Sequence, residues 1–334
     1  MILGRIARIV AFVLILGFAV AAMLAWRSYT SPLPLQSVPF AFEVRPGASL
    51  SSIARELEVA GVLPYPWALT GLARIRSVDR SIKAGNYEIV APLTLPQLLD
   101  KLTQGDVTQA SFMIVEGGTF AELKRALRGS ADIKNTVLDL PDSELMARLG
   151  ANGKNPEGLF FPDTYFFAVG TTDFAVLQRA YRALDARLAA AWSQRSPDLP
   201  FDSPYQALIL ASIVEKETGR ASDRPLIASV FVNRLRKGMR LQTDPTVIYG
   251  MGDKFDGNLR KRDLEADTPW NTYTRDGLPP TPIALVSQAS IDAVLTPPTT
   301  EYLYFVSRGD GTSQFSSNLV EHNRAVTKFQ KGGR

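Results

Sequence analysis

An uncharged apolar run near the N-terminus restricts most strongly what this 334-residue chain can become. The run extends from Ile9 to Trp26, with Arg5 and Arg8 before it and Arg27 after it. As an α-helix, a run of this length rises about 27 Å, close to the roughly 30 Å thickness of a bilayer's hydrocarbon core. Basic residues before such a run favour a cytoplasmic N-terminus. The sequence therefore predicts that residues 1–30 form a cytoplasmic tip and a single-pass transmembrane anchor.

A cleaved signal peptide is the alternative interpretation, because Ala19-Val20-Ala21 resembles a cleavage site. Against it, the run is longer than the usual apolar segment of a signal peptide. It also ends in the pair Trp26-Arg27, which is typical of a membrane interface. We therefore expect a retained anchor. Both interpretations place the folded residues outside the cytoplasm.

Residue counts exclude several kinds of chemistry. The chain has no cysteine and one histidine, His322, which excludes disulfides, thiolate nucleophiles, iron–sulfur clusters and Cys/His zinc sites. Its 37 basic and 33 acidic residues give a net charge of +4, without the basic stripe typical of a nucleic-acid binder. We therefore expect no metal, no cofactor and no nucleic-acid partner. The remaining chemistry must depend on carboxylates, hydroxyls, amides or lysine, and His322 is expected to be a structural or substrate-edge hydrogen bonder.

Residues 31–105 predict a spacer and a small subdomain. The proline-rich stretch 31–39 is expected to be an extended spacer. In residues 40–105, a strand is followed by two helices, a second strand and a short helix, with Ser49 and Thr94 at helix starts. The strand–helix–helix–strand order resembles the LysM-type wall-binding module. A small α+β spacer without a ligand is the alternative.

Residues 106–331 predict a larger α+β domain. Thr119 and Glu122 have the spacing of a capping box before a helix. Apolar residues at helical spacing from Phe174 to Leu188 predict a helix packed on a core. The most apolar helix of the exported part extends from Tyr205 to about Thr218, and residues 302–306 predict a buried strand.

Glu217 is the leading catalytic candidate. Its helix is apolar on nearly every side from Gln206 to Val214, which predicts burial. Glu215 and Glu217 are separated by about 200° around the helix axis, so at most one of them faces a given cleft. Glu217 continues the buried face to the helix C-terminus, where desolvation and the helix dipole both raise the pKa of a carboxyl. A carboxyl protonated near neutral pH is what a general acid for glycoside cleavage requires. The alternative is a helix-end glutamate paired with Lys216 or a nearby arginine.

Three further segments carry candidate substrate-binding residues. Carboxylates, hydroxyls and aromatic rings together suit a sugar, which has apolar faces and hydroxyl edges. The segment EGLFFPDTY (157–165) offers Glu157, Asp163 and Tyr165, with a packed turn as the alternative. The candidates in LQTDPTVIYG (241–250) and NTYTRDGLPP (271–280), where a surface turn is the alternative, are Gln242, Thr243, Asp244, Thr246, Asn271 and Tyr273.

Long motifs in a fixed order resemble one family of cell-wall enzymes. The motifs are EGLFFPDTY (157–165), ASIVEKETG (211–219), ASVFVNRLRKGMRLQTDPTVIYG (228–250), NTYTRDGLPP (271–280), and YLYFV with NLVEHN (302–323). With them the chain resembles the endolytic murein transglycosylase family, the YceG-like, MltG-type proteins. The resemblance extends from the membrane segment to near the C-terminus. One departure follows GLPP, where the family usually has Gly and later an Asn/Thr-Pro-Gly turn. Thr281 and Leu285-Val286-Ser287 occupy those positions here.

The resemblance implies an α+β chain with an anchor in a bacterial inner membrane and a cytoplasmic N-terminus. It implies a periplasmic LysM-like subdomain at 40–105 and a YceG-like catalytic domain at 106–331. The implied activity is that of an endolytic lytic transglycosylase, a lyase that terminates nascent glycan strands of peptidoglycan. It cleaves their MurNAc–GlcNAc β-1,4 bonds with formation of 1,6-anhydroMurNAc. The essential acid of the family corresponds to Glu217. The implied partners are peptidoglycan strands and the membrane, with cell-wall synthases as candidates.

Two other functions remain open. A water-using muramidase would need a second carboxylate, for which Asp244 and Asp163 are the candidates. A non-catalytic wall-binding or wall-assembly protein would bind glycan without cutting it, and would tolerate substitution of Glu217.

Overall fold

The structure is a computed structural model that describes residues 12, 15–20, 23, 26–27, 29–35, 39–45, 47–106 and 109–331. The predicted cytoplasmic tip and much of the predicted anchor, Ile9–Trp26, lie outside the described residues. Within the described part, no helix has both the length and the apolar character needed to cross a bilayer. The chain divides into two compact units, Met1–Ala110 with Phe166–Gly170 and Ser111–Tyr165 with Thr171–Arg334. Helices mixed with small sheets confirm the predicted α+β class.

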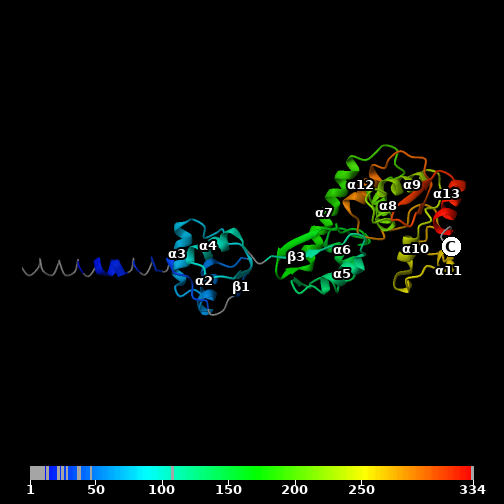
Figure 1. The fold of residues 1–334 in the computed structure, drawn as a ribbon. Coiled ribbons are helices and arrows are strands. Elements are labelled where there is room, and N and C mark those ends of the chain that lie inside the picture. Colours follow the sequence, from blue (N-terminus) through cyan, green and yellow to red (C-terminus); the bar gives the residue numbers. More distant parts are fainter. Residues whose placement is uncertain are drawn as a thin grey trace, which may run out of the picture. The chain divides into compact units, whose positions relative to one another are not determined.

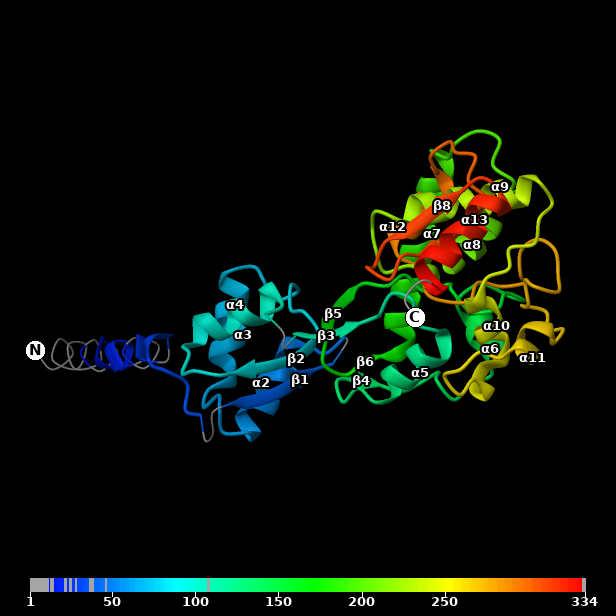
Figure 2. The same cartoon turned by 45° about the vertical axis from the view of Figure 1, so that its right-hand side comes forward.

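The first unit combines a two-stranded antiparallel sheet with three helices. The two strands pair from Phe40 opposite Ile89 to Val44 opposite Gly85, and this register turns Tyr87 into the core. Leucines and isoleucines at helical spacing on the following helices complete that core. The elements, labelled in Figure 2, are β1 (Phe40–Val44), α2 (Leu50–Val59), α3 (Pro66–Ile75), β2 (Gly85–Ile89) and α4 (Leu95–Gln104).

Part of the stretch predicted to be an extended spacer packs against this unit. Leu33 is buried, and its N–H donates to the Leu93 carbonyl at 2.8 Å. Pro32 forms an isolated antiparallel bridge with Thr94, at the start of α4. Proline-rich sequence favours an extended backbone, but it does not decide whether that backbone stands in solvent or lies along a folded surface. Here residues 31–35 follow the surface.

The elements after the first unit alternate short strands with helices. In chain order they are β3 (Gln109–Met113), α5 (Phe120–Arg128), β4 (Ile133–Lys134), α6 (Asp142–Arg148), β5 (Thr164–Ala168), β6 (Thr171–Thr172), α7 (Asp173–Ser193), α8 (Pro204–Glu217), α9 (Arg224–Arg236), α10 (Asp244–Met251), η1 (Gly252–Lys254), α11 (Lys261–Glu265), α12 (Gln288–Leu295), β7 (Tyr304–Ser307), β8 (Ser313–Ser316), α13 (Leu319–Val326) and η2 (Thr327–Lys331).

Helix α8 forms the centre of the second unit. Ser203 caps its start by accepting from the Gln206 N–H, and Pro204 occupies the first turn, where its missing N–H is not needed. Every residue from Ala207 to Val214 is buried, because α7, α9, α10 and α12 all pack on α8. Figure 1 shows α8, α9 and α12 beside one another. The apolar helix predicted from the sequence is therefore enclosed by other helices. Glu217, its last residue, lies beyond the fully buried part.

Small sheets complete the second unit. Strand β4 pairs in parallel with β6, and β7 pairs with β8 in an antiparallel ladder from Tyr304 opposite Ser316 to Ser307 opposite Ser313. Helix α13 packs on β7 and β8. The strand predicted at 302–306 lies two residues later and is only partly covered, since Val306 is its buried residue. Its remaining surface is available to line a cavity.

Candidate active site

A cavity of about 710 Å³ lies beside the C-terminal end of α8. Its walls come from α8, α9, the loop before α10, the loop around Tyr273, and the β7–β8–α13 region. Polar side chains that line it are Glu217, Arg234, Gln242, Thr243, Asp244, Tyr273, Tyr304, Ser307, Ser313, His322, Asn323 and Gln330. A cavity of this size, with several converging polar groups, is typical of a ligand site.

Glu217 is the last residue of α8, and its carboxyl faces this cavity. The next residue, Thr218, is extended, so the helix ends there. The Thr243 hydroxyl donates a hydrogen bond to Glu217 Oε1. Burial raises the pKa of Glu217, and the nearby Asp244 carboxylate raises it further. The Thr243 hydrogen bond and the Arg234 guanidinium oppose that change, and the net shift of the pKa is upward. The structure thus gives Glu217 the environment of a carboxyl that holds its proton.

Glu215 faces away from the cavity, as the 200° separation predicts. Its Oε2 accepts from both the backbone N–H and the hydroxyl of Ser287, and its Oε1 lies 3.7 Å from an Arg224 nitrogen. Ser287 also caps α12 by accepting from the Ser290 N–H. Ser287, one of the residues at the departure noted from the sequence, therefore ties α8 to the start of α12. Glu215 is a structural group, whereas Glu217 is available for chemistry.

The loop before α10 brings Thr243 to Glu217. Gln242 adopts a φ of 50°, in the left-handed region, which costs a non-glycine residue about 1 kcal/mol. Its N–H donates to the Thr272 carbonyl, and the Thr243 N–H donates to the Thr272 hydroxyl, both at 3.1 Å. These two bonds hold the strained loop against the segment around Thr272. As a result, the buried Thr243 side chain is directed at the carboxyl of Glu217.

Asp244 and Tyr273 form a second polar pair in the cavity. The Tyr273 hydroxyl donates to Asp244 Oδ1 at 2.6 Å. Burial raises the pKa of Tyr273, so it remains a donor at neutral pH. Asp244 lies in the first turn of α10, where the helix dipole favours a negative charge. A fixed negative charge therefore lies next to Glu217.

Arg234 is the charged residue of the cavity that the sequence analysis missed. Its Nε donates to the Leu303 carbonyl at 2.7 Å and its Nη1 to the Leu241 carbonyl at 2.8 Å. The guanidinium also lies over the Tyr304 ring, 5.2 Å from its centre. A signal was present, because Arg234 follows Ile227 and Phe231 at helical spacing on a face that is otherwise apolar.

The β7–α13 side of the cavity presents a flat aromatic pair. The rings of Tyr304 and His322 stack with centroids 5.1 Å apart and planes 24° apart. His322 Nδ1 is buried and has no hydrogen-bond partner among the described residues. Burial lowers the pKa of His322, as does the nearby Arg234 charge, so its ring is neutral. Such a surface suits the apolar face of a sugar ring.

Thr246 and Asn271 lie behind the cavity wall. The Thr246 hydroxyl donates to the Thr243 carbonyl at 2.7 Å. The Asn271 amide donates to the Leu264 and Ala266 carbonyls at 3.0 and 2.7 Å. Both side chains are fully buried, so they shape the loops that carry Thr243 and Tyr273.

The structure does not bring Glu157, Asp163 and Tyr165 into this cavity. Glu157 is buried and accepts from the Phe120 N–H at 2.9 Å and the Tyr249 hydroxyl at 3.1 Å, and burial raises its pKa to about 7. It lines a separate cavity of about 500 Å³. Tyr165 is buried with its hydroxyl on the Phe161 carbonyl at 2.8 Å, and Asp163 is at the surface. The segment is a packed turn, the alternative noted from its sequence.

This chain is similar to a protein family, to curated proteins that share one name, and to a solved structure of the same family. The family model described as the YceG-like family matches residues 42–328. A protein of Bacillus subtilis (strain 168), named endolytic murein transglycosylase, is 32% identical over 301 residues, or 85% of this chain and 82% of that protein. A protein of the same name from Streptococcus pneumoniae serotype 2 is 27% identical over 318 residues, 84% of this chain and 57% of its own length. A crystal structure of a YceG-like protein from Listeria monocytogenes has a TM-score of 0.54 at 30% identity, covering 86% of this chain and 98% of that one.

Proposed function

The chain belongs to the YceG-like family, and from this membership we propose that it is a peptidoglycan lytic transglycosylase with Glu217 as both acid and base. The observation that carries the proposal is the Glu217 carboxyl at the end of a buried helix, in a cavity, with its pKa raised by burial. The names of the relatives from Bacillus subtilis and Streptococcus pneumoniae support the same activity. The enzyme is thus a lyase that acts on glycan strands.

In the first step, the bond between C1 of MurNAc and O4 of GlcNAc breaks. Protonated Glu217 donates its proton to O4, so GlcNAc leaves with a free 4-hydroxyl while positive charge develops at C1. Burial favours the protonated carboxyl before this step. The Arg234 guanidinium then stabilises the carboxylate that the step produces, because its charge favours the ionised form.

In the second step, the ring closes without water. The Glu217 carboxylate accepts the proton of the 6-hydroxyl of the same MurNAc, and O6 bonds to C1 to give the 1,6-anhydro end. Glu217 finishes protonated, as it began. Because the nucleophile belongs to the substrate, a single acid/base group is sufficient. The Tyr304–His322 stack, Gln242 and the Asp244–Tyr273 pair are the candidates to hold the sugar and its N-acetyl group.

The proposed location is the periplasmic side of a bacterial inner membrane. The apolar run Ile9–Trp26 and the basic residues before it support this location. There the enzyme would meet nascent strands as they form and terminate their growth by internal cuts, and cell-wall synthases are the candidate protein partners.

Digestion of purified glycan strands by the full chain tests the proposal. We expect internal cleavage, seen as a rapid fall in mean strand length with fragments of many sizes early in the reaction. Size-exclusion chromatography with mass spectrometry measures both the sizes and the ends. Binding to strands without any cleavage would identify a non-catalytic wall-binding protein instead.

The water-using muramidase remains the second candidate because Asp244 lines the same cavity as Glu217. A carboxylate there can act as the base that activates water. Its hydroxyl partner Tyr273, at 2.6 Å, leaves further oxygen lone pairs of the carboxylate free. Substitution of Asp244 distinguishes the two reactions.

Asp244→Asn should move the alkaline limb of the pH–rate profile to lower pH. The Asp244 charge raises the pKa of Glu217, and the acid must be protonated in the free enzyme. Removing the charge lowers that pKa, so kcat/KM falls at a lower pH than in the unsubstituted enzyme. The measurement is kcat/KM against pH, with Asp276→Asn, which removes a surface charge paired with Arg240, as the matched control. Loss of cleavage at every pH in the variant, together with new ends heavier by one water in the unsubstituted enzyme, would instead assign Asp244 a direct part in hydrolysis.

A further inference from the structure

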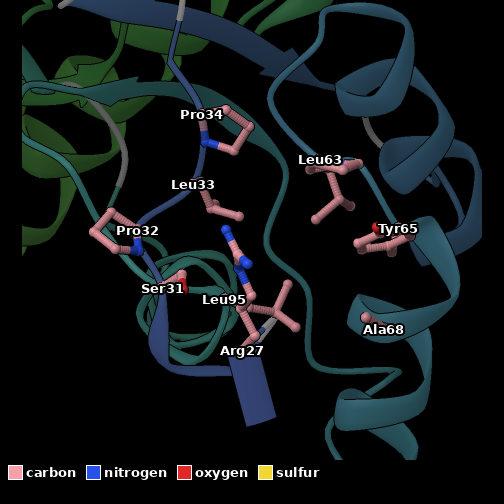
Figure 3. Close-up of a pocket in the computed structure, with 10 residues that line it drawn as sticks. Arg27, Ser31, Pro32, Leu33, Pro34, Leu63, Tyr65, Ala68 and Leu95 are labelled. Carbon is pink, nitrogen blue, oxygen red and sulfur yellow. The ribbon is translucent and has the colours of Figure 1, made fainter. Parts of the chain in front are cut away.

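A cavity in the first unit lies beside the end of the apolar N-terminal run. It has a volume of about 360 Å³, and Arg27, Leu33, Leu63, Tyr65, Ala68 and Leu95 are among the residues that line it. Figure 3 shows the Arg27 side chain entering the space that Leu33, Leu63 and Leu95 enclose. Arg27 is the first residue after the run and the only charged residue among the described residues that line the cavity.

The charge of Arg27 has no counter-ion in the described part of the chain. No ion pair joins it to a described acidic residue, and the rest of the lining is apolar apart from Ser31 and Tyr65. Arg27 is exposed, so its guanidinium is open to an anionic group from outside the chain, which would form a charge-assisted hydrogen bond with it. The cavity therefore fits a ligand with an anionic group and an apolar part.

The segment that carries Arg27 is attached to the unit. The Ser31 N–H donates to the Arg27 carbonyl at 2.9 Å, and the Arg76 guanidinium donates to the Tyr29 hydroxyl at 3.4 Å. With Leu33 buried and bonded to Leu93, this segment holds Arg27 against the cavity. The cavity is thus a feature of the folded unit.

Exposed aromatic residues mark the same region. Trp26 is 69% exposed, Tyr29 43%, Tyr65 46% and Trp67 61%. Tyr65 and Trp67 lie together, with ring centres 6.0 Å apart. Tryptophan and tyrosine are enriched where a protein meets the headgroup layer of a membrane. Together with the run that ends at Trp26, they indicate that the mouth of the cavity lies at the membrane surface.

We propose that this cavity binds the phosphate of an anionic membrane phospholipid. Arg27 supplies the positive charge, and Leu33, Leu63 and Leu95 contact the glycerol and the first carbons of the acyl chains. This inference depends on the proposed membrane anchor and is independent of the chemistry at Glu217. A basic residue near an anionic bilayer contributes an attraction that corresponds to about a fivefold change in binding.

Native mass spectrometry of the full chain in detergent tests the proposal, with dioleoylphosphatidylglycerol or dioleoylphosphatidylcholine added. We expect one phosphatidylglycerol retained per chain, with about fivefold lower occupancy for phosphatidylcholine. Arg27→Gln should lower phosphatidylglycerol occupancy by about the same factor. Ala68→Phe, which fills the cavity without changing charge, should lower it too. Arg55→Gln, an exposed arginine on α2, is the matched control and should leave occupancy unchanged.

Three outcomes would overturn the proposal. They are equal retention of the two lipids, occupancy unaffected by both Arg27→Gln and Ala68→Phe, and displacement of the lipid by an equal concentration of inorganic phosphate, which would indicate a site for the free anion. Strand cleavage in detergent by both variants should match the unsubstituted enzyme. Failure of lipid binding with cleavage intact would therefore refute this inference alone and leave the proposed activity standing.

Discussion

Glu217→Gln should abolish cleavage of glycan strands, lowering kcat/KM by a factor on the order of 10³ or more. Glutamine has nearly the shape of the protonated carboxyl and can still accept from the Thr243 hydroxyl, but it neither donates a proton to O4 nor accepts one from O6. Both steps of the proposed reaction are lost together. The measurement is release of fragments from purified strands by the full chain at its optimal pH.

The same variant should be at least as stable as the unsubstituted chain above neutral pH. The pKa of Glu217 is raised in the folded state, so its contribution to stability is complete below the unfolded pKa. That contribution is lost as pH rises through the folded pKa. A neutral glutamine does not lose it, so the Tm of Glu217→Gln at pH 8 should be equal or higher. Formation of anhydro ends by a folded Glu217→Gln enzyme would contradict the assignment.

Glu215→Gln, on the same helix, is the matched control. It removes the negative charge that faces Arg224 and so weakens their contact. The Nε of Arg224 already has no hydrogen-bond partner among the described residues, so the buried guanidinium loses part of its remaining stabilisation. We expect a loss of about 1–3 kcal/mol of unfolding free energy. Strand cleavage should persist below its lowered Tm. The pair of variants thus separates activity from stability.

Gly158→Ala should destabilise the second unit by about 2–4 kcal/mol, from the left-handed backbone and from overpacking. Gly158 has a φ of +75°, and a Cβ placed there would lie 2.4 Å from the Pro282 Cβ and 3.1 Å from the Ala284 carbonyl oxygen. The same segment also bonds to α8, because the Ile283 N–H donates to the Ser212 hydroxyl oxygen at 2.9 Å. The packed turn at 157–165 therefore supports α8 from outside the active site.

Gly153→Ala is the matched control for that prediction. Gly153 has the same φ of +75°, and a Cβ there would meet nothing within 4 Å. Its cost is the backbone conformation alone, about 1–2 kcal/mol. Unfolding by urea, followed by circular dichroism, measures both variants. Equal destabilisation of the two would show that the contact of Gly158 with Pro282 has no energetic importance.

Helices with local signals were predictable from the sequence. Ser49 and Thr119, both predicted at helix starts, cap the helices that follow them, and the apolar pattern of α8 placed Glu217 at the exit of a buried helix. These features depend on neighbours within one or two turns. Gln242, Thr243, Asp244 and Tyr273 were predicted because loops rich in such groups suit a sugar, and the structure places all four in the cavity with Glu217.

Features that depend on distant partners were not predictable. The composition of 157–165 is the same for a sugar site as for a packed turn, and only the contacts of Glu157 with Phe120 and Tyr249 separate the two. Arg234 was missed because its importance comes from the carbonyls of Leu241 and Leu303, which other parts of the chain supply. Amphipathic patterns report which face of an element is buried but not which polar groups meet across the fold.

Digestion of glycan strands in water enriched in ¹⁸O tests most directly whether one carboxyl completes the reaction without water. Mass spectrometry of the newly formed ends is the measurement, with the full chain as enzyme. The proposed reaction predicts anhydro ends that carry no ¹⁸O, since the oxygen that bonds to C1 comes from the 6-hydroxyl of the same sugar. New ends heavier by one water and labelled with ¹⁸O would contradict it, and would show that the enzyme is a hydrolase.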